Sequence, residues 1–226
     1  MSDAAAATEA ERAVAAAADG IRAVARRLDD ARGREGRLHA DGEALTLAGL
    51  EAAAEAAVVD AGGTAPAARV ESPDGPKPGD PVVVAVEPSV EGVPGPCSRT
   101  FVVDGGGGWE RRAAVAVGMA HDAVRRVVEP GLPARRVVDE AVAELGAYGL
   151  GTAATPVARS VGGDRIDFDS DAPLSAGRVF VLAPAAVDPD PDRDHGRVRI
   201  GICYLVTESG CRALDTLPTS LSPGAY

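Results

Sequence analysis

The sequence has 226 residues, 46% of them hydrophobic and 3% aromatic, so it can bury a core built mainly from Ala, Val and Leu. It carries 34 acidic and 23 basic residues, for a formal net charge of −11 with a single lysine. Such acidity argues against a nucleic-acid partner, because phosphates attract basic patches, and is typical of a solvated halophilic surface.

The first half of the chain reads as helices followed by strands. Thr8 and Glu11 form a capping box that predicts a helix start, and Thr46 is placed to cap a second helix. We expect, in order, a frayed tail at 1–7, a helix to about 28–30, a polar connection, a helix at about 47–59, and strands near 67–71, 81–86 and 98–103.

The second half begins after the glycine run "DGGGG" and repeats this order. Ala113, Val117, Ala120 and Val124 recur at helical spacing and predict one buried stripe. We expect helices at about 109–128 and 134–145, strands near 178–182, 197–206 and 211–215, an exposed acidic loop "DPDPDRDHG", and a C-terminal tail at 217–226.

An internal repeat links the two halves. Each contains a helix ending at glycine and then, after a loop, a glycine and a valine-rich strand, "KPGDPVVVAV" and "SAGRVFVLAP". Matching Gly79 to Gly177 places Ala85 opposite Ala183. We therefore predict one α+β domain over 8–220, made of similar halves at about 8–104 and 109–216 with a pocket where their sheets meet.

Five segments in this order, "KPGD", "SRTFVV", "LSAGRVFVLAP", "GRVRIG" and "YLVTESGCRALDTLP", carry a resemblance over nearly the whole chain. The chain resembles the pita-bread metallopeptidases: methionine aminopeptidases, Xaa-Pro aminopeptidases, proline dipeptidases and creatinase. The resemblance implies helices covering a curved, mostly antiparallel sheet with two pseudo-symmetric halves. It also implies a pair of divalent metals that activate water, held by two Asp, one His and two Glu.

None of the five metal ligands that the resemblance implies is present. The position of the first Asp is Ala85, and that of the second, eleven residues later, is Pro96. The stretch "YGLGTAATPVARSVGGD" has no histidine where the family has one. The two Glu positions are Ala183 and Gly201. We therefore expect no metal cofactor, no catalytic residue of the family type, and a fold that does not need metal.

Other residues near these positions are candidate pocket-lining groups. Glu87 follows Ala85 by two residues and either replaces a ligand or is solvated where the strand ends. Cys97 and Cys203 are buried structural thiols or a thiolate site. Arg99 and Arg199 either point into the pocket, where they would favour an anionic group, or pair with acids on the surface.

The remaining cysteine and histidines indicate no site. Cys211 makes the cysteine count odd, with no C-x-x-C spacing, which indicates reduced thiols rather than disulfides or a zinc finger. His39 lies in a polar connection and His195 in the acidic loop, whereas His121 lies at the edge of the predicted stripe and should be half-buried.

Three functions remain open from the sequence. The first is a non-catalytic pseudopeptidase that binds an unknown peptide, small molecule or protein. The second is an active aminopeptidase, dipeptidase or creatinase-type hydrolase with an unconventional site. The third is a structural subunit that forms a homodimer or pairs with an active paralogue. Lacking an apolar run of membrane-spanning length and a signal-peptide pattern, the chain is expected to be cytoplasmic.

Overall fold

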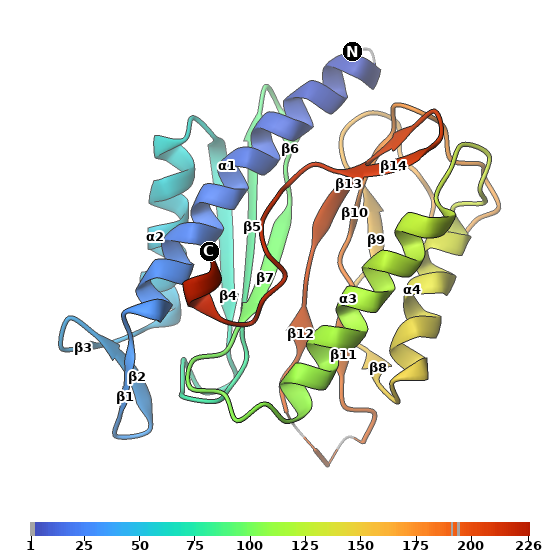
Figure 1. Cartoon of the computed structure of the whole chain (residues 1–226). Coiled ribbons are helices and arrows are strands. Elements are labelled where there is room, and N and C mark those ends of the chain that lie inside the picture. The colour runs from blue at the N-terminus through green and yellow to red at the C-terminus, as the bar shows by residue number, and fades with distance from the viewer. Residues whose placement is uncertain (1–2, 191, 194) are drawn as a thin grey trace.

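The computed structural model describes residues 3–190, 192–193 and 195–226. In Figure 1 the helices lie in pairs on one side of a curved layer of strands, α1 with α2 and α3 with α4. The helices of the described chain are α1 (Asp3–Asp29), α2 (Leu47–Asp60), α3 (Trp109–Val127), α4 (Arg135–Ala147) and the short 3-10 helix η1 (Pro223–Ala225).

The strands pair antiparallel throughout. The first half holds β4 (Thr64–Glu71), β5 (Val82–Val90), β6 (Val93–Pro94) and β7 (Cys97–Phe101), with β5 paired to each of the other three. The second half holds two sheets, ordered β14-β13-β10-β9 and β12-β11-β8. Their strands are β8 (Gly151–Thr152), β9 (Ala158–Ser160), β10 (Val179–Leu182), β11 (Ala185–Val187), β12 (Val198–Arg199), β13 (Ile202–Thr207) and β14 (Gly210–Ala213).

The internal repeat has a matching backbone geometry in the two halves. Gly79 and Gly177 both adopt positive φ, +83° and +85°, just before the buried strands β5 and β10. The Gly79 N–H donates to the Val103 carbonyl at 2.7 Å, and the Gly177 N–H donates to the Val206 carbonyl at 2.9 Å. Each glycine therefore starts its strand in a left-handed conformation that residues with a Cβ rarely adopt.

The two chain ends are more ordered than the expected tails: the described part of the N-terminal tail is helical, and the C-terminal tail packs against the first half. Helix α1 begins at Asp3, so Thr8 lies inside the helix and does not cap it. The alanine-rich start favours helix strongly enough to extend it past the capping box. At the other end the Tyr226 ring packs edge-on against Phe101, with centroids 5.0 Å apart, and the Val102 N–H donates to the Leu221 carbonyl at 2.9 Å.

Two further departures concern the first half. The polar connection contains a small three-stranded sheet, β1 (Arg32–Arg34), β2 (Arg37–Ala40) and β3 (Glu43–Ala44). Strand β5 continues through Pro88 to Val90 instead of ending near residue 86. Glu87 therefore lies within a strand and not in a turn.

Close packing of α1 against the β6–β7 connection depends on Gly95. A Cβ at this position would overlap the backbone of Ala13 and Val14 in α1. We expect Gly95→Ala to lower the free energy of unfolding by about 1–3 kcal/mol, because the helix must move away. Gly118→Ala on α3, where a Cβ would meet nothing within 4 Å, is the control and should stabilise slightly. Equal effects of the two in urea unfolding would contradict this account of Gly95.

Candidate functional site

The positions singled out in the sequence come together at a small cavity between the two halves. The cavity measures about 50 Å³ and lies on the sheet side facing away from α1 and α2. Gly201 adjoins it, since a Cβ there would lie 3.3 Å from the Ala183 Cβ and would overlap the Ser98 hydroxyl. Its lining consists of Ala85, Val86, Glu87, Pro96, Cys97, Ser98, Arg159, Val181, Ala183 and Arg199.

Strand alternation explains which side chains reach this cavity. Val84 and Val86 of β5 pack into the core beneath α1 and α2, so Ala85 and Glu87 face the opposite side. Ala85 is the antiparallel partner of Ser98 on β7. Ser98 in turn pairs with Gly201 across the two halves, through N–H···O bonds of 3.2 and 2.9 Å.

The mouth of the cavity carries charged groups from both halves. Glu87 of β5 and Arg159 of β9 form an ion pair, with 42% and 39% of their side chains exposed. Arg199 of β12 makes no ion pair within the described residues, and its Nε–H is buried without a hydrogen-bond partner. Burial, with Arg197 and Arg159 nearby, lowers the pKa of Arg199, although guanidinium remains a cation in proteins.

Ser98 is the second unsatisfied group in the cavity. The residue is 3% exposed, and its Oγ has no hydrogen-bond partner within the described chain. Buried hydroxyl groups are nearly always hydrogen-bonded, because an unmade bond costs about 1–3 kcal/mol. The cavity thus holds an unpaired hydroxyl beside a cation whose Nε–H is also unpaired.

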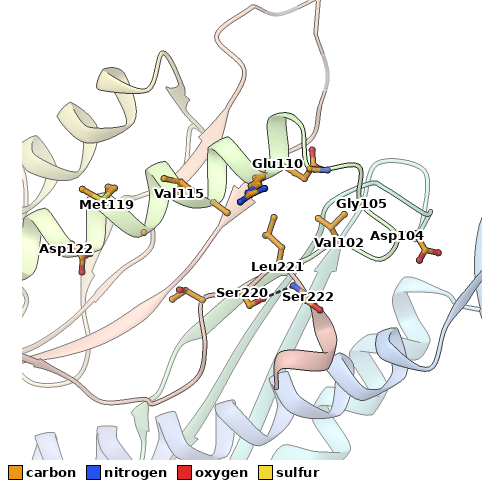
Figure 2. A pocket seen from close by; sticks show the side chains of 15 residues that line it. Val102, Asp104, Gly105, Glu110, Val115, Met119, Asp122, Ser220, Leu221 and Ser222 are labelled. Carbon is orange, nitrogen blue, oxygen red and sulfur yellow. Dashed lines mark hydrogen bonds between the residues drawn. The ribbon is translucent and has the colours of Figure 1, made fainter.

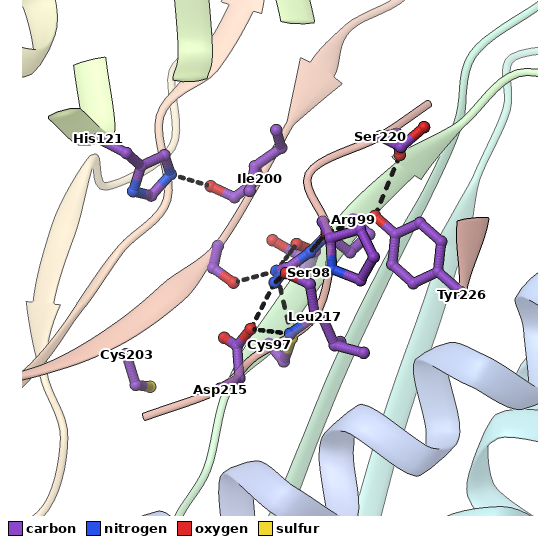
Figure 3. A network of polar contacts seen from close by, with 12 residues as sticks. Cys97, Ser98, Arg99, His121, Ile200, Cys203, Asp215, Leu217, Ser220 and Tyr226 are labelled. Carbon is purple, nitrogen blue, oxygen red and sulfur yellow. Dashed lines mark hydrogen bonds and ion pairs between the residues drawn. The ribbon is translucent and has the colours of Figure 1, made fainter. Parts of the chain in front are cut away.

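Arg99 neither lines the cavity nor lies on the surface; it pairs with an acid, as one alternative expected, but in the core. Its side chain is completely buried on the α1 side of β7, within 2.6 Å of the Asp215 carboxylate (Figure 3). Its guanidinium also donates to the carbonyls of Gly201 and Pro218, at 2.9 and 2.8 Å. Arg99 is therefore a structural cation that joins both halves to the C-terminal segment.

The two buried cysteines are unreactive thiols. Burial raises the pKa of Cys97 to about 12, despite the opposing effect of Arg99, and raises that of Cys203 well above its ordinary value. The Cys203 Sγ–H donates to the Pro96 carbonyl at 3.1 Å. Thiolates are the reactive and metal-binding form, so these residues support the structural interpretation.

The histidines lie outside the cavity. His121 is only 4% exposed rather than half-buried, and it bonds to Ile200 and Tyr204. The ring of His195 stacks on Trp109, with centroids 5.4 Å apart. Within the described ranges, no group of three or more His, Cys, Asp and Glu is arranged to hold a metal ion.

Larger hollows lie elsewhere. A groove of about 670 Å³ separates α3 from the C-terminal segment, and Figure 2 shows Val115 and Met119 on one side with Leu221 on the other. A second hollow, of about 460 Å³, includes Val83 on β5 and Arg197 just before β12, which lie two residues before Ala85 and Arg199 respectively. The small cavity differs from these hollows in bringing the predicted positions together with two unsatisfied polar atoms of the described chain, Ser98 Oγ and Arg199 Nε.

The sequence interpretation missed Ser98 and Arg159. Arg159 lies in the stretch where the family has its histidine, and Ser98 lies between the candidate residues Cys97 and Arg99. Ser98 could have been found only from the strand register that pairs residue 98 with 85, and Arg159 only from the register that pairs residue 159 with 181. Of the candidate residues, Glu87, Cys97 and Arg199 are in the lining, although the Cys97 side chain packs in the core beneath α1, and Cys203 is not in the lining.

Comparison with known proteins finds one matching family. A sequence model of metallopeptidase family M24 matches residues 5–208. A comparison with curated proteins finds no match. No helix among the described residues is long and apolar enough to cross a membrane.

Solved structures similar to this chain include peptidases. The dipeptidase PepE from Mycobacterium ulcerans is 24% identical with a TM-score of 0.78, over 96% of this chain and 60% of that one. The prolidase from Pyrococcus furiosus is 21% identical, also with 0.78, over 93% and 64%. The X-Pro aminopeptidase from Thermotoga maritima is 18% identical with 0.73, over 94% and 61%. The chain thus spans less than two thirds of each.

Proposed function

The chain belongs to metallopeptidase family M24, and we propose that it is a non-catalytic member that binds a peptide, small molecule or protein. Its α+β pita-bread fold, expected from the sequence, is confirmed. The observation that carries the proposal is the small cavity, where alanine, proline and glycine occupy the expected ligand positions and two arginines lie alongside.

The residues of the cavity do not fit a pair of divalent metals. Glu87 is the single carboxylate in its lining and is already paired with Arg159. Arg159 and Arg199 are cations and would repel a metal ion. A glutamate at Gly201 would overlap Ser98, so even the space for a ligand is reduced. We therefore derive no metal-dependent step at this site.

Loss of the carboxylates is compatible with a stable fold. Acidic groups clustered in an empty pocket repel one another and are costly to bury. Alanine and glycine remove that cost, and the protein should fold without metal. We expect overnight treatment with EDTA to leave the melting temperature unchanged, measured against an active M24 prolidase treated in parallel. A clear loss of thermal stability would show that a metal supports the fold.

The test of function combines metal content with turnover. The purified chain is offered Mn, Co, Zn and Fe, dialysed, and analysed by mass spectrometry for bound metal. The same sample is assayed on Xaa-Pro and Met-Ala peptides, with an active prolidase as control. We expect near-zero metal and no turnover. About two metals per chain together with turnover would instead establish an active hydrolase with an unconventional site.

A further inference from the structure

We propose that the small cavity binds a carboxylate group, held by the Arg199 guanidinium and the Ser98 hydroxyl in the space beside Ala85 and Ala183. This inference rests on the proposed function, because metals and their ligands in the same cavity would leave no room for the group. The bound group is a monoanion with two oxygens in one plane.

Ser98 is the first support for a bound group. Its hydroxyl is buried, reaches the cavity, and has no partner in the described chain. The neighbouring backbone groups are unavailable, since the N–H and carbonyl of Ser98 already pair with Gly201. The hydroxyl can therefore donate to an oxygen placed in the cavity.

Arg199 supplies the charge. Its backbone is fixed by two 2.8 Å hydrogen bonds with the Thr100 hydroxyl, which ties β12 to β7. Its side chain lines the cavity with the Nε–H buried and unpaired. A guanidinium presents adjacent N–H groups that match the two oxygens of a carboxylate, and a partly buried cation without an anion is costly.

The charges around Arg199 favour a monoanion over a phosphate or other dianion. Arg159 and Arg197 are each already paired, with Glu87 and Glu71 respectively. One unpaired positive charge therefore remains, and Glu87 would repel a second negative charge at the mouth. A volume of about 50 Å³ admits a group of a few atoms but not a folded segment.

Space for the rest of the ligand lies beside the cavity. Val83, which lines the 460 Å³ hollow, lies on the same face of β5 as Ala85, about 7 Å along the strand. Arg197, which also lines it, directly precedes β12 and lies two residues before Arg199. The carboxylate can belong to a free small acid or to the C-terminus of a short peptide. In both cases the same carboxylate contacts Arg199. Only the peptide has further atoms that would occupy the 460 Å³ hollow.

The experiment titrates the ¹⁵N-labelled protein with acetate at constant ionic strength, followed by backbone amide shifts. Acetamide, which has the same shape without the charge, is the ligand control. Alanyl-valine and its C-terminal amide form a second pair. We expect saturable shifts near Ser98 and Gly201 with both acids and none with either amide. Binding of the dipeptide at least tenfold tighter than acetate assigns a peptide terminus, and similar affinities assign a small acid.

Substitutions distinguish acetate binding in the cavity from a general effect of the protein's charge. Arg199→Met should weaken acetate binding about tenfold or more, and Ser98→Ala should weaken it severalfold. Glu87→Gln should strengthen it, because it frees Arg159 and removes a repelling charge. Arg126→Met removes an exposed charge on α3 and should change nothing. Ser98→Ala should also leave stability unchanged or raise it, since the hydroxyl has no partner to lose and its burial is costly.

Two results overturn the inference: equal binding of acetate and acetamide, or unchanged acetate binding in Arg199→Met. They are separable from failure of the proposed function. If the chain is metal-free and inactive but does not bind carboxylates, only the carboxylate site is contradicted. If the chain binds two metals and shows turnover, the proposed non-catalytic function is wrong, whether or not acetate binds.

Discussion

Replacing Arg99 with methionine is expected to lower the free energy of unfolding by about 3–5 kcal/mol, the largest effect of any single substitution considered. Methionine matches much of the volume but leaves the Asp215 carboxylate buried without its cation. Asp215 is only 2% exposed, so water cannot replace the guanidinium. The cost of an uncompensated buried charge then falls on the folded state alone.

The effect is large because Arg99 connects three segments distant in sequence. It donates to the carbonyls of Ser98 and Gly201, both at 2.9 Å, and so joins β7 to the second half. It also reaches Asp215 at 2.6 Å and the Pro218 carbonyl at 2.8 Å (Figure 3). Each carbonyl would lose a charge-assisted partner together with the ion pair.

Arg199→Met provides the matched control, as both arginines lie on strands of the junction. Its side chain makes no ion pair in the described structure, so we expect stability to change little or to rise. Unfolding is followed by circular dichroism in urea. If Arg99→Met is not obtained folded, Arg99→Lys is tested, since one ammonium cannot satisfy the same set of acceptors. Equal stability of the Arg99 and Arg199 variants would show that the buried network contributes nothing.

Periodicity and turn residues predicted most of the elements. Thr46 caps α2 as expected, accepting from the Gly49 N–H at 3.1 Å. The valine-rich runs after Gly79 and Gly177 became β5 and β10 because they are bounded by glycine and rich in β-branched residues. The small three-stranded sheet at 32–44 also has a turn signal in the sequence, since Gly36 and Gly42 adopt positive φ at its turns. Its strands are polar and lack the hydrophobic alternation that predicts a strand.

The site could be predicted only in part, because its residues come from strands whose register is set by long-range pairing. Ala85 and Ala183 were placed opposite each other by the internal repeat, and the cavity contains both. The partner of Arg99 lies 116 residues away, at Asp215, and no local pattern links them. The direction of the Arg99 side chain follows from the alternation of side chains along β7. The sequence alone does not show which face of β7 lies toward the pocket.

Acid is expected to destabilise the protein through His121 on α3. The ring is buried, its Nε2 lies 3.1 Å from the Ile200 carbonyl, and its Nδ1 lies 3.0 Å from the Tyr204 hydroxyl. A carbonyl can only accept, so Nε2–H donates and Nδ1 accepts from the hydroxyl, which is the neutral tautomer. Burial lowers the pKa of His121 from 6.5 to about 4, opposed by the bond to Ile200 and aided by Arg99 and Arg125.

The direction of the pH effect follows from these two values. Because the folded pKa of about 4 lies below the unfolded 6.5, the unfolded chain binds the proton first as pH falls. The contribution is complete above pH 6.5 and is lost progressively toward pH 4. A difference of about 2.5 pKa units corresponds to about 3 kcal/mol, of which about 2 kcal/mol is lost by pH 5.

His121→Gln tests this, since an amide can still donate to Ile200 and accept from Tyr204 but does not titrate. The free energy of unfolding of both proteins is measured from pH 7 to pH 5. We expect the difference between them to shrink by about 2 kcal/mol over that range, because only the parent loses stability through residue 121. A constant difference between the parent and His121→Gln would mean that the buried ring accepts a proton as readily when folded. It would then not be a neutral connection between α3 and the strand junction at Gly201.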